Sequence, residues 1–195
     1  MNKILSVCVY GASSNRIAPV YIEAARELGT LIGQHGIRLI NGAGSAGLML
    51  ASSTAAMAAG GKATGIIPRF MVDEGWGNSE QSEMLVVESM HERKQMMANM
   101  SDAVIALPGG IGTLEEMLEI ITWKQLGLYL NPIVILNING YYDLLLAMLN
   151  HAMEEHFMRT GHAALWEVAT TPQEAIELIY SLPLWDKTMR KFAAI

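Results

Sequence analysis

The sequence predicts a single α/β domain of Rossmann-like type, in which helices cover both faces of a mostly parallel sheet. Short apolar runs alternate along the chain with segments of helical periodicity, and the connections between them are short. A length of 195 residues fits one domain that can bury a sizeable core. Residues 1–195 are therefore expected to form one unit, without an internal repeat or a second domain.

Composition excludes several classes of protein. Hydrophobic residues make up 51% of the chain and charged residues 16%, which excludes a disordered protein. The net charge of −6 argues against a nucleic-acid polymer as partner, although a local basic pocket could hold a small phosphate. No apolar run approaches the roughly 18 residues of a membrane-spanning helix, so no membrane contact is expected. The lone Cys8 lies in an apolar run and predicts a buried thiol in a reducing cytoplasm.

The first half of the chain predicts three strands separated by two helices. The first helix, over residues 18–35, has Pro19 in its first turn and Gly36 as its stop signal. An alanine-rich helix follows residues 42–47 and ends at Gly60 and Gly61. The strands cover residues 4–10, 37–41 and 62–67.

The second half continues the same alternation after a longer connection. Residues 68–83 carry glycines and charges and predict a loop long enough to be functional. Thr171 and Glu174 form a capping box with Pro172 at the first helical position, and residues 185–195 predict a short surface helix. The other expected elements are strands at 84–87, 103–107, 133–136 and near 168, and helices over 91–100, 113–126 and 142–157.

A glycine cluster between an apolar run and a helical pattern predicts a phosphate-binding loop. Pro108 follows the apolar run, and glycines occupy positions 109, 110 and 112. Glycines allow positive φ angles and keep Cβ atoms away, so successive backbone N–H groups can converge on an anion. The helix expected from Thr113 adds unpaired N–H groups and the positive end of its dipole. Thr113 and Glu116 also fit a capping box, which needs no ligand, and this alternative stays open.

Helical phase separates the acidic residues of this helix. At about 100° per residue, Glu115 and Glu119 share a polar stripe, whereas Glu116 lies over Ile120 and Trp123 on a second apolar face. A carboxylate in apolar surroundings is costly unless it is paired, and it is often functional. The apolar face with Trp123 also suggests burial against another subunit, so a homodimer is expected.

An arginine on the preceding helix could pair with this carboxylate. Met90, Arg93 and Met97 share one stripe at i, i+3 and i+7, which directs Arg93 toward the packed side, although spacing alone also allows a solvated charge. A guanidinium that points inward needs a carboxylate or phosphate partner. Glu116 and a phosphate on the glycine loop are the candidates.

Other motifs point to different chemistry. Gly42, Gly44 and Gly47 match the dinucleotide fingerprint, but residues 62–68 contain no carboxylate where a ribose-binding acid belongs. The five histidines lack the spacing of a helical metal pair. No Gly-x-Ser-x-Gly elbow supplies a nucleophile, and no lysine lies in a recognisable pyridoxal-phosphate context. We therefore expect neither a metal ion nor a cofactor.

Together these residues resemble a known signature. The run Pro108-Gly109-Gly110-x-Gly112-Thr113-x-x-Glu116, with Met90-x-x-Arg93-Lys94, is similar to the signature of the LOG ("lonely guy") family. Members of that family are cytokinin riboside 5′-monophosphate phosphoribohydrolases, often mislabelled as lysine decarboxylases. The resemblance extends from Ser13-Ser14 through Gly44-Ser45-x-Gly47-Leu48-Met49 to Thr122-Trp123-x-Gln125-Leu126-Gly127.

The resemblance implies hydrolysis of the N-glycosidic bond of an N6-modified adenosine 5′-monophosphate, by a homodimer. It makes Arg93 and Glu116 the catalytic pair and places the 5′-phosphate on the glycine loop. Ala12, Ala43 and the loop over residues 70–83 depart from the family pattern, so base specificity stays open. A broader purine nucleotide nucleosidase and a non-catalytic nucleotide carrier or sensor are the alternatives. The residues expected to bind substrate are Ser13, Ser14, Gly44, Ser45, Met90, Lys94, Gly109, Gly110, Ile111, which also departs from the pattern, Gly112 and Thr113.

Overall fold

The computed structural model describes residues 3–188, which fold around one parallel sheet. Within this part of the chain seven strands lie in the order β4-β3-β2-β1-β5-β6-β7, and every neighbouring pair is parallel. The predicted α/β class is thereby confirmed. The strands are β1 (Ser6–Tyr10), β2 (Arg38–Asn41), β3 (Lys62–Pro68), β4 (Glu83–Val87), β5 (Val104–Ala106), β6 (Ile133–Leu136) and β7 (Glu167–Ala169).

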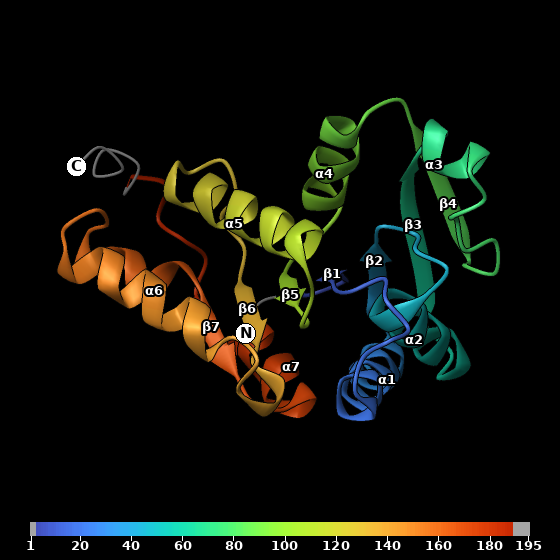
Figure 1. Ribbon diagram of the computed structural model, residues 1–195, viewed down its shortest axis with the longest axis horizontal. Helices are drawn as coiled ribbons and strands as arrows, with labels where there is room; N and C mark the ends of the chain where they lie inside the picture. The colour runs from blue at the N-terminus through green and yellow to red at the C-terminus, as the bar shows by residue number, and fades with distance from the viewer. Residues whose placement is uncertain (1–2, 189–195) are drawn as a thin grey trace.

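Helices cover both faces of the sheet (Figure 1). One layer consists of α1 (Pro19–Gln34), α2 (Gly47–Ala58) and α7 (Pro172–Ser181). The opposite layer consists of α4 (Met90–Asn99), α5 (Ile111–Gln125) and α6 (Asp143–Glu154). The remaining described elements are the short helix α3 (Arg69–Asp73) and two 3₁₀ turns, η1 (Ile138–Gly140) and η2 (Thr160–Leu165).

The strands are apolar on both sides because both faces of the sheet are covered. Along β1, Val7 and Val9 point into the core beneath α1, α2 and α7, whereas Cys8 and Tyr10 point into the core beneath α4, α5 and α6. Cys8 is fully buried, as predicted, and burial raises the pKa of its thiol well above the usual range.

The order of the strands creates a crevice at the carboxyl ends of β1 and β5. From β1 the chain proceeds outward to β4, then returns to the other side of β1 with β5 and continues to β7. The connections that follow β1 and β5 lead to helices on opposite faces, α1 and α5. Ligands in open parallel sheets bind at such a point, so the fold predicts where a site belongs.

Three elements differ from the sequence-based expectation. The helix α3 lies inside the segment 68–83, which was expected to be a loop. The helix α5 begins at Ile111, two residues earlier than expected, because Gly110 takes the N-cap position. Of the expected tail helix, residues 185–186 are not helical and residues 189–195 lie outside the described residues. Between residues 3 and 188, no helix has the length and apolar character that a membrane span requires.

Candidate active site

A cleft of about 710 Å³ opens at the crevice of the sheet. Its walls come from the loops after β1, β2 and β3, from α4 and from the first turns of α5. These segments are far apart in the sequence, and the parallel sheet brings their ends together. The predicted site residues that line the cleft are Ser13, Ser14, Gly44, Ser45, Met90, Arg93, Gly110, Gly112, Thr113 and Glu116.

Arg93 reaches this cleft from α4 and is only 6% exposed. Its Nη2 atom lies 3.6 Å from Glu116 Oε1. Its Nε donates to the carbonyl of Ile66 over 3.2 Å, and Nη2 donates to the carbonyl of Gly42 over 3.3 Å. Two backbone carbonyls and a carboxylate therefore fix the guanidinium. The inward direction predicted from the helical stripe is confirmed.

Glu116 faces Arg93 from α5 with a side chain that is 11% exposed. Burial raises the pKa of its carboxyl group and outweighs the lowering by the Arg93 guanidinium. Ile120 and Trp123 pack into the core on the same face of the helix, which confirms the apolar surroundings predicted from helical phase. A cleft carboxylate with a perturbed pKa is suited to proton exchange and to stabilising positive charge.

Gly42 makes room for the arginine. A Cβ atom built on Gly42 would lie 1.6 Å from Arg93 Nη2. Any larger residue at this position would therefore displace the guanidinium from its place beside Glu116.

The N-terminus of α5 meets the cleft without a side-chain cap. Gly110 is the N-cap, and among the described residues no side-chain hydrogen bond caps the helix. The capping-box alternative for Thr113 and Glu116 is therefore excluded, because Thr113 lies in the first turn and Glu116 in the second. The first N–H groups of α5 and the positive end of its dipole remain available to an anion.

The glycines of this loop provide space rather than positive φ angles. None of Gly109, Gly110 and Gly112 has a positive φ, which corrects the conformational reason predicted for them. A Cβ atom on Gly109 would lie 2.0 Å from Thr113 Oγ1, so this glycine lets Thr113 pack against the loop. A Cβ atom on Gly110 or Gly112 would meet no described atom within 4 Å. Their missing side chains leave the backbone open to a ligand.

The second glycine motif, residues 42–47, serves the packing of the protein itself. Its first glycine accommodates the arginine. At its end, the N–H of Gly47 donates to Asn15 Oδ1 over 2.8 Å, and the N–H of Leu48 donates to the carbonyl of Ala12 over 2.7 Å. The start of α2 is thus already capped. Contacts within the protein thus explain the first and last glycines of the motif without a dinucleotide, which weakens the dinucleotide alternative.

Three of the predicted binding residues lie outside the lining of the cleft. Lys94 pairs with Glu115 and, at 2.9 Å, with Glu119. Ile111 is 83% exposed, and Gly109 lies against the side chain of Thr113. These positions connect or shape the walls of the cleft and do not form its surface.

Sequence reasoning missed the apolar wall of the cleft. This wall consists of Met49, Ile67, Met71 and Trp76. The Trp76 segment is tied to the loop after β2, because the N–H of Ser45 donates to the Trp76 carbonyl over 3.2 Å. The length of the segment 68–83 predicted a functional role, but the pairing across the cleft depends on long-range packing.

Besides the ion pair, a further carboxylate lines the cleft, that of Glu115, which is paired with Lys94. The buried lysines Lys94 and Lys124 are absent from its lining. Between residues 3 and 188, no three histidine, cysteine, aspartate or glutamate side chains come together as metal ligands. The chemistry of the cleft therefore has to be explained from its ion pair, its backbone N–H groups and its apolar wall.

Comparison with known proteins gives matches over most of the chain. A family model described as "Possible lysine decarboxylase" matches residues 49–179. The probable cytokinin riboside 5′-monophosphate phosphoribohydrolase LOGL2 of Oryza sativa subsp. japonica is 42% identical over 187 residues, which cover 95% of this chain and 76% of that protein. The cytokinin riboside 5′-monophosphate phosphoribohydrolase LOG5 of Arabidopsis thaliana is 40% identical over 171 residues, covering 88% and 75% respectively.

Solved structures share the fold. The molybdenum cofactor carrier protein from Chlamydomonas reinhardtii has a TM-score of 0.69 at 23% identity, covering 92% of this chain and 98% of that one. The molybdenum cofactor binding protein from Rippkaea orientalis has a TM-score of 0.66 at 25% identity, covering 90% and 94%. At such identities the likeness is one of fold, and it agrees with the Rossmann-like arrangement.

Proposed function

Because the chain belongs to the LOG family of cytokinin riboside 5′-monophosphate phosphoribohydrolases, we infer that it is an N-glycosyl hydrolase of nucleoside 5′-monophosphates. Its substrates are adenosine 5′-monophosphates with an N6 substituent, and its products are the free base and ribose 5-phosphate. One observation carries this function. A single cleft joins the Arg93–Glu116 ion pair to the uncapped N-terminus of α5.

We assign the chemical step to Glu116. Cleavage of the glycosidic bond builds positive charge on the ribose ring, so a fixed carboxylate near C1′ lowers the barrier. The oxygen of a water molecule forms a bond to C1′ while the bond from C1′ to the base breaks. The base leaves with the electron pair and takes up one proton, and the water, which Glu116 orients, gives up one proton as its oxygen bonds to C1′, so the protons balance. Arg93 favours the ionised form of Glu116, because its guanidinium opposes the rise in pKa that burial causes.

We assign the 5′-phosphate to the start of α5. The N–H groups near Gly110 and Gly112 and the helix dipole favour an anion there. Ser13, Ser14 and Ser45 bring hydroxyl groups to the same cleft from the loops after β1 and β2. Lys94 is left out of this assignment, since its ammonium group is already paired with two carboxylates.

The apolar wall suits the substituted base. Met71 and Trp76 from the segment after β3 line the cleft together with Met49 and Met90. Thioether and indole groups can pack on a purine ring and on an aliphatic N6 substituent. We therefore propose that this wall makes an N6-substituted monophosphate a better substrate than plain AMP.

One experiment tests the function and its alternatives. The protein is incubated with AMP, with isopentenyladenosine monophosphate and with the two corresponding nucleosides, and free base and ribose 5-phosphate are measured. Release of base from the monophosphates alone is expected, because the nucleosides lack the anion that α5 binds. Equal rates for both monophosphates would identify a broader AMP nucleosidase. Tight binding without release would identify a nucleotide carrier or sensor and overturn the enzymatic function.

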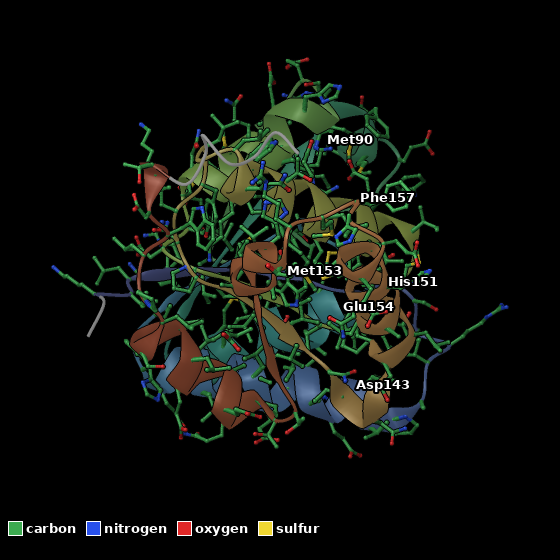
Figure 2. The ribbon with its side chains drawn as sticks, turned by 90° about the vertical axis from the view of Figure 1, so that its left-hand side faces the viewer. Met90, Asp143, His151, Met153, Glu154 and Phe157 are labelled. Atoms are coloured by element: carbon green, nitrogen blue, oxygen red, sulfur yellow. The ribbon has the colours of Figure 1, made fainter. Side chains whose placement is uncertain are left out.

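We also propose a homodimer, on a different surface from the one that helical phase indicated. The face with Ile120 and Trp123 packs within the chain itself. In contrast, α6 has no buried residue, and Leu144 and Met148, one turn apart, are 86% and 60% exposed. Figure 2 looks onto this helix and labels Phe157, which lies beyond the end of the helix. Phe157 is 76% exposed. Exposed apolar groups gathered in this way suit pairing with a second copy.

Sedimentation equilibrium tests the dimer. We expect a dimer for the unaltered chain and a monomer for the double variant Leu144→Glu, Met148→Glu, because charge opposes burial of this surface. Leu5→Glu, at a 58% exposed leucine just before β1, is the control and keeps the dimer. A monomeric unaltered chain refutes the proposal.

A further inference from the structure

Side chains of the turn between β6 and α6 hold the backbone of that turn in place. Asn137 Oδ1 accepts the N–H of Tyr142 over 2.7 Å, and Asn137 Nδ2 donates to Asp143 Oδ1 over 2.7 Å. Asn139 and Gly140 follow in the left-handed region, with φ angles of 53° and 69°. This geometry places two adjacent tyrosines, Tyr141 and Tyr142, against the loop that follows β5.

The hydroxyl groups of both tyrosines bind carbonyl groups of that loop. Tyr141 Oη donates to the carbonyl of Gly109 and Tyr142 Oη to the carbonyl of Leu107, each over 2.7 Å. The Tyr141 ring packs edge-on against Tyr142, with centroids 5.0 Å apart, and against Tyr21 of α1, with centroids 5.7 Å apart. Neighbouring rings therefore hold Tyr141 in place independently of its hydroxyl group.

The hydrogen bond from Tyr141 determines the direction of one peptide unit. The Gly109 carbonyl and the Gly110 N–H belong to the same planar trans peptide, so they point in opposite directions. Because the carbonyl is held toward Tyr141, the N–H of Gly110 points away from Tyr141, and Gly110 lines the cleft whereas Tyr141 does not. A peptide between two glycines rotates with little steric resistance, because neither residue has a Cβ atom. The hydroxyl group supplies the restraint that the side chains do not.

We propose that Tyr141 is a positioning residue for the substrate phosphate, which it orients by aiming the Gly110 N–H at that group. The inference rests on the proposed function, since it concerns the phosphate of that substrate. Tyr142 has a different part. The Leu107 carbonyl that it binds shares its peptide unit with Pro108, which has no N–H to orient. Both tyrosines thus make a hydrogen bond of the same length, but only that of Tyr141 orients a backbone N–H group. Tyr142→Phe is therefore a matched control.

The test compares the unaltered chain with Tyr141→Phe and Tyr142→Phe. Both variants keep their rings and lose one hydroxyl group. For Tyr141→Phe we expect KM for the monophosphate substrate and Kd for ribose 5-phosphate to rise about 3- to 15-fold, with kcat nearly unchanged. For Tyr142→Phe we expect a lower Tm, because the buried Leu107 carbonyl loses its donor, with KM and Kd nearly unchanged.

An amide signal gives a second, direct measurement. In protein labelled with ¹⁵N-glycine, added inorganic phosphate shifts the Gly110 amide resonance, and we expect this shift to shrink in Tyr141→Phe and to persist in Tyr142→Phe. Equal affinity for ribose 5-phosphate in the unaltered chain and Tyr141→Phe overturns the inference, and so does an equal loss in both variants. An unaltered chain that binds ribose 5-phosphate but releases no base overturns the proposed function, while the comparison of the Kd values still tests Tyr141.

Discussion

Two adjacent basic residues of α4 form ion pairs with α5. Arg93 pairs with Glu116, and Lys94 pairs with Glu115 and Glu119. The side chains of Arg93 and Glu116 are 8% and 11% exposed, whereas that of Glu115 is 50% exposed. Both glutamates line the cleft, but one step along the helix separates a buried carboxylate from one that reaches solvent.

The two sets of ion pairs differ in the group whose pKa is shifted, which is the acid Glu116 in one and the base Lys94 in the other. Burial raises the pKa of Glu116 even though Arg93 lies beside it. Burial would lower the pKa of Lys94, but its hydrogen bonds to Glu115 and Glu119 outweigh this, and the pKa is raised. The first arrangement costs stability and leaves a carboxyl group with a raised pKa, while the second stabilises the contact between helices. The burial of the acid, rather than the presence of an ion pair, distinguishes the pair to which we assign catalysis.

The largest contrast is expected between two adjacent glutamates. Glu116→Gln lowers kcat for base release by about 1,000-fold or more, because the positive charge of the transition state loses its carboxylate. Glu115→Gln, one residue away and half exposed, changes kcat by less than about threefold. Release of free base is measured for both variants, and calorimetry checks that Glu116→Gln still binds the nucleotide. Full activity of Glu116→Gln would remove the basis of the mechanism.

Substitution of Gly42, which lies against the ion pair, is expected to have the next largest effect on kcat. Gly42→Ala places a Cβ atom where Arg93 Nη2 lies, so the guanidinium must move away from Glu116. We expect kcat to fall about 10- to 100-fold. The acid limb of the kcat profile also moves to higher pH, since the pKa of Glu116 loses the lowering by Arg93. Gly161→Ala, whose Cβ atom meets no described atom within 4 Å, is the control. An unchanged pH profile in Gly42→Ala would contradict the role of Arg93.

The sequence predicts the fold and the Arg93–Glu116 ion pair well because both depend on local periodicity. Alternating apolar runs and helical patterns suffice for a parallel sheet, and helical phase alone separates Glu116 from Glu115. The stripe on α4 predicts that Arg93 points inward, which its 6% exposure confirms. The capping box that Thr113 allowed is excluded because Gly110 caps α5 and the helix begins at Ile111, two residues earlier than expected. Local patterns thus predict a direction more reliably than a helix boundary.

Contacts between distant segments could not be predicted in this way. Gly42 belongs to a dinucleotide-like motif, but a glycine is needed there because the side chain of Arg93, 51 residues further along the chain, fills the space that a Cβ atom would take. Tyr141 reaches Gly109 across 32 residues, and Trp76 enters the cleft on a segment whose position depends on the loop after β2. Each of these roles comes from packing between separate elements, for which one sequence contains no periodic signal.

A second buried lysine shows the effect of burial on a pKa where no carboxylate among the described residues is paired with the ammonium group. Lys124 on α5 is 4% exposed, and burial lowers its pKa to about 8, although Glu167 opposes this. Below pH 8 the folded chain must hold a buried charge. Lys124→Met is therefore expected to raise the free energy of unfolding at pH 7 by about 2 kcal/mol.

The pH dependence checks the sign of this effect. Between pH 8 and 10.5 the unfolded chain binds a proton that folded Lys124 does not, so the unaltered chain gains stability as pH rises and the advantage of Lys124→Met shrinks. Urea unfolding at pH 7, 9 and 10.5 measures this, with the exposed Lys62→Met as control. A constant difference over this range would show that packing, and not charge, causes the gain.

The smallest effect, of opposite sign, is expected at Lys94. Lys94→Met removes the partner of Glu115 and Glu119, which lie one turn apart and then repel each other, so the free energy of unfolding at pH 7 falls by about 1 kcal/mol. The raised pKa means that this stabilisation is complete below the unfolded value of 10.5 and is lost as pH rises through the folded value, so the deficit disappears only in strong alkali. Urea unfolding measures the deficit, and base release should stay within about threefold of the unaltered chain, because Arg93 and Glu116 keep their own contacts. A large loss of kcat in this variant would make Lys94 part of the site and would erase the distinction between the two ion pairs.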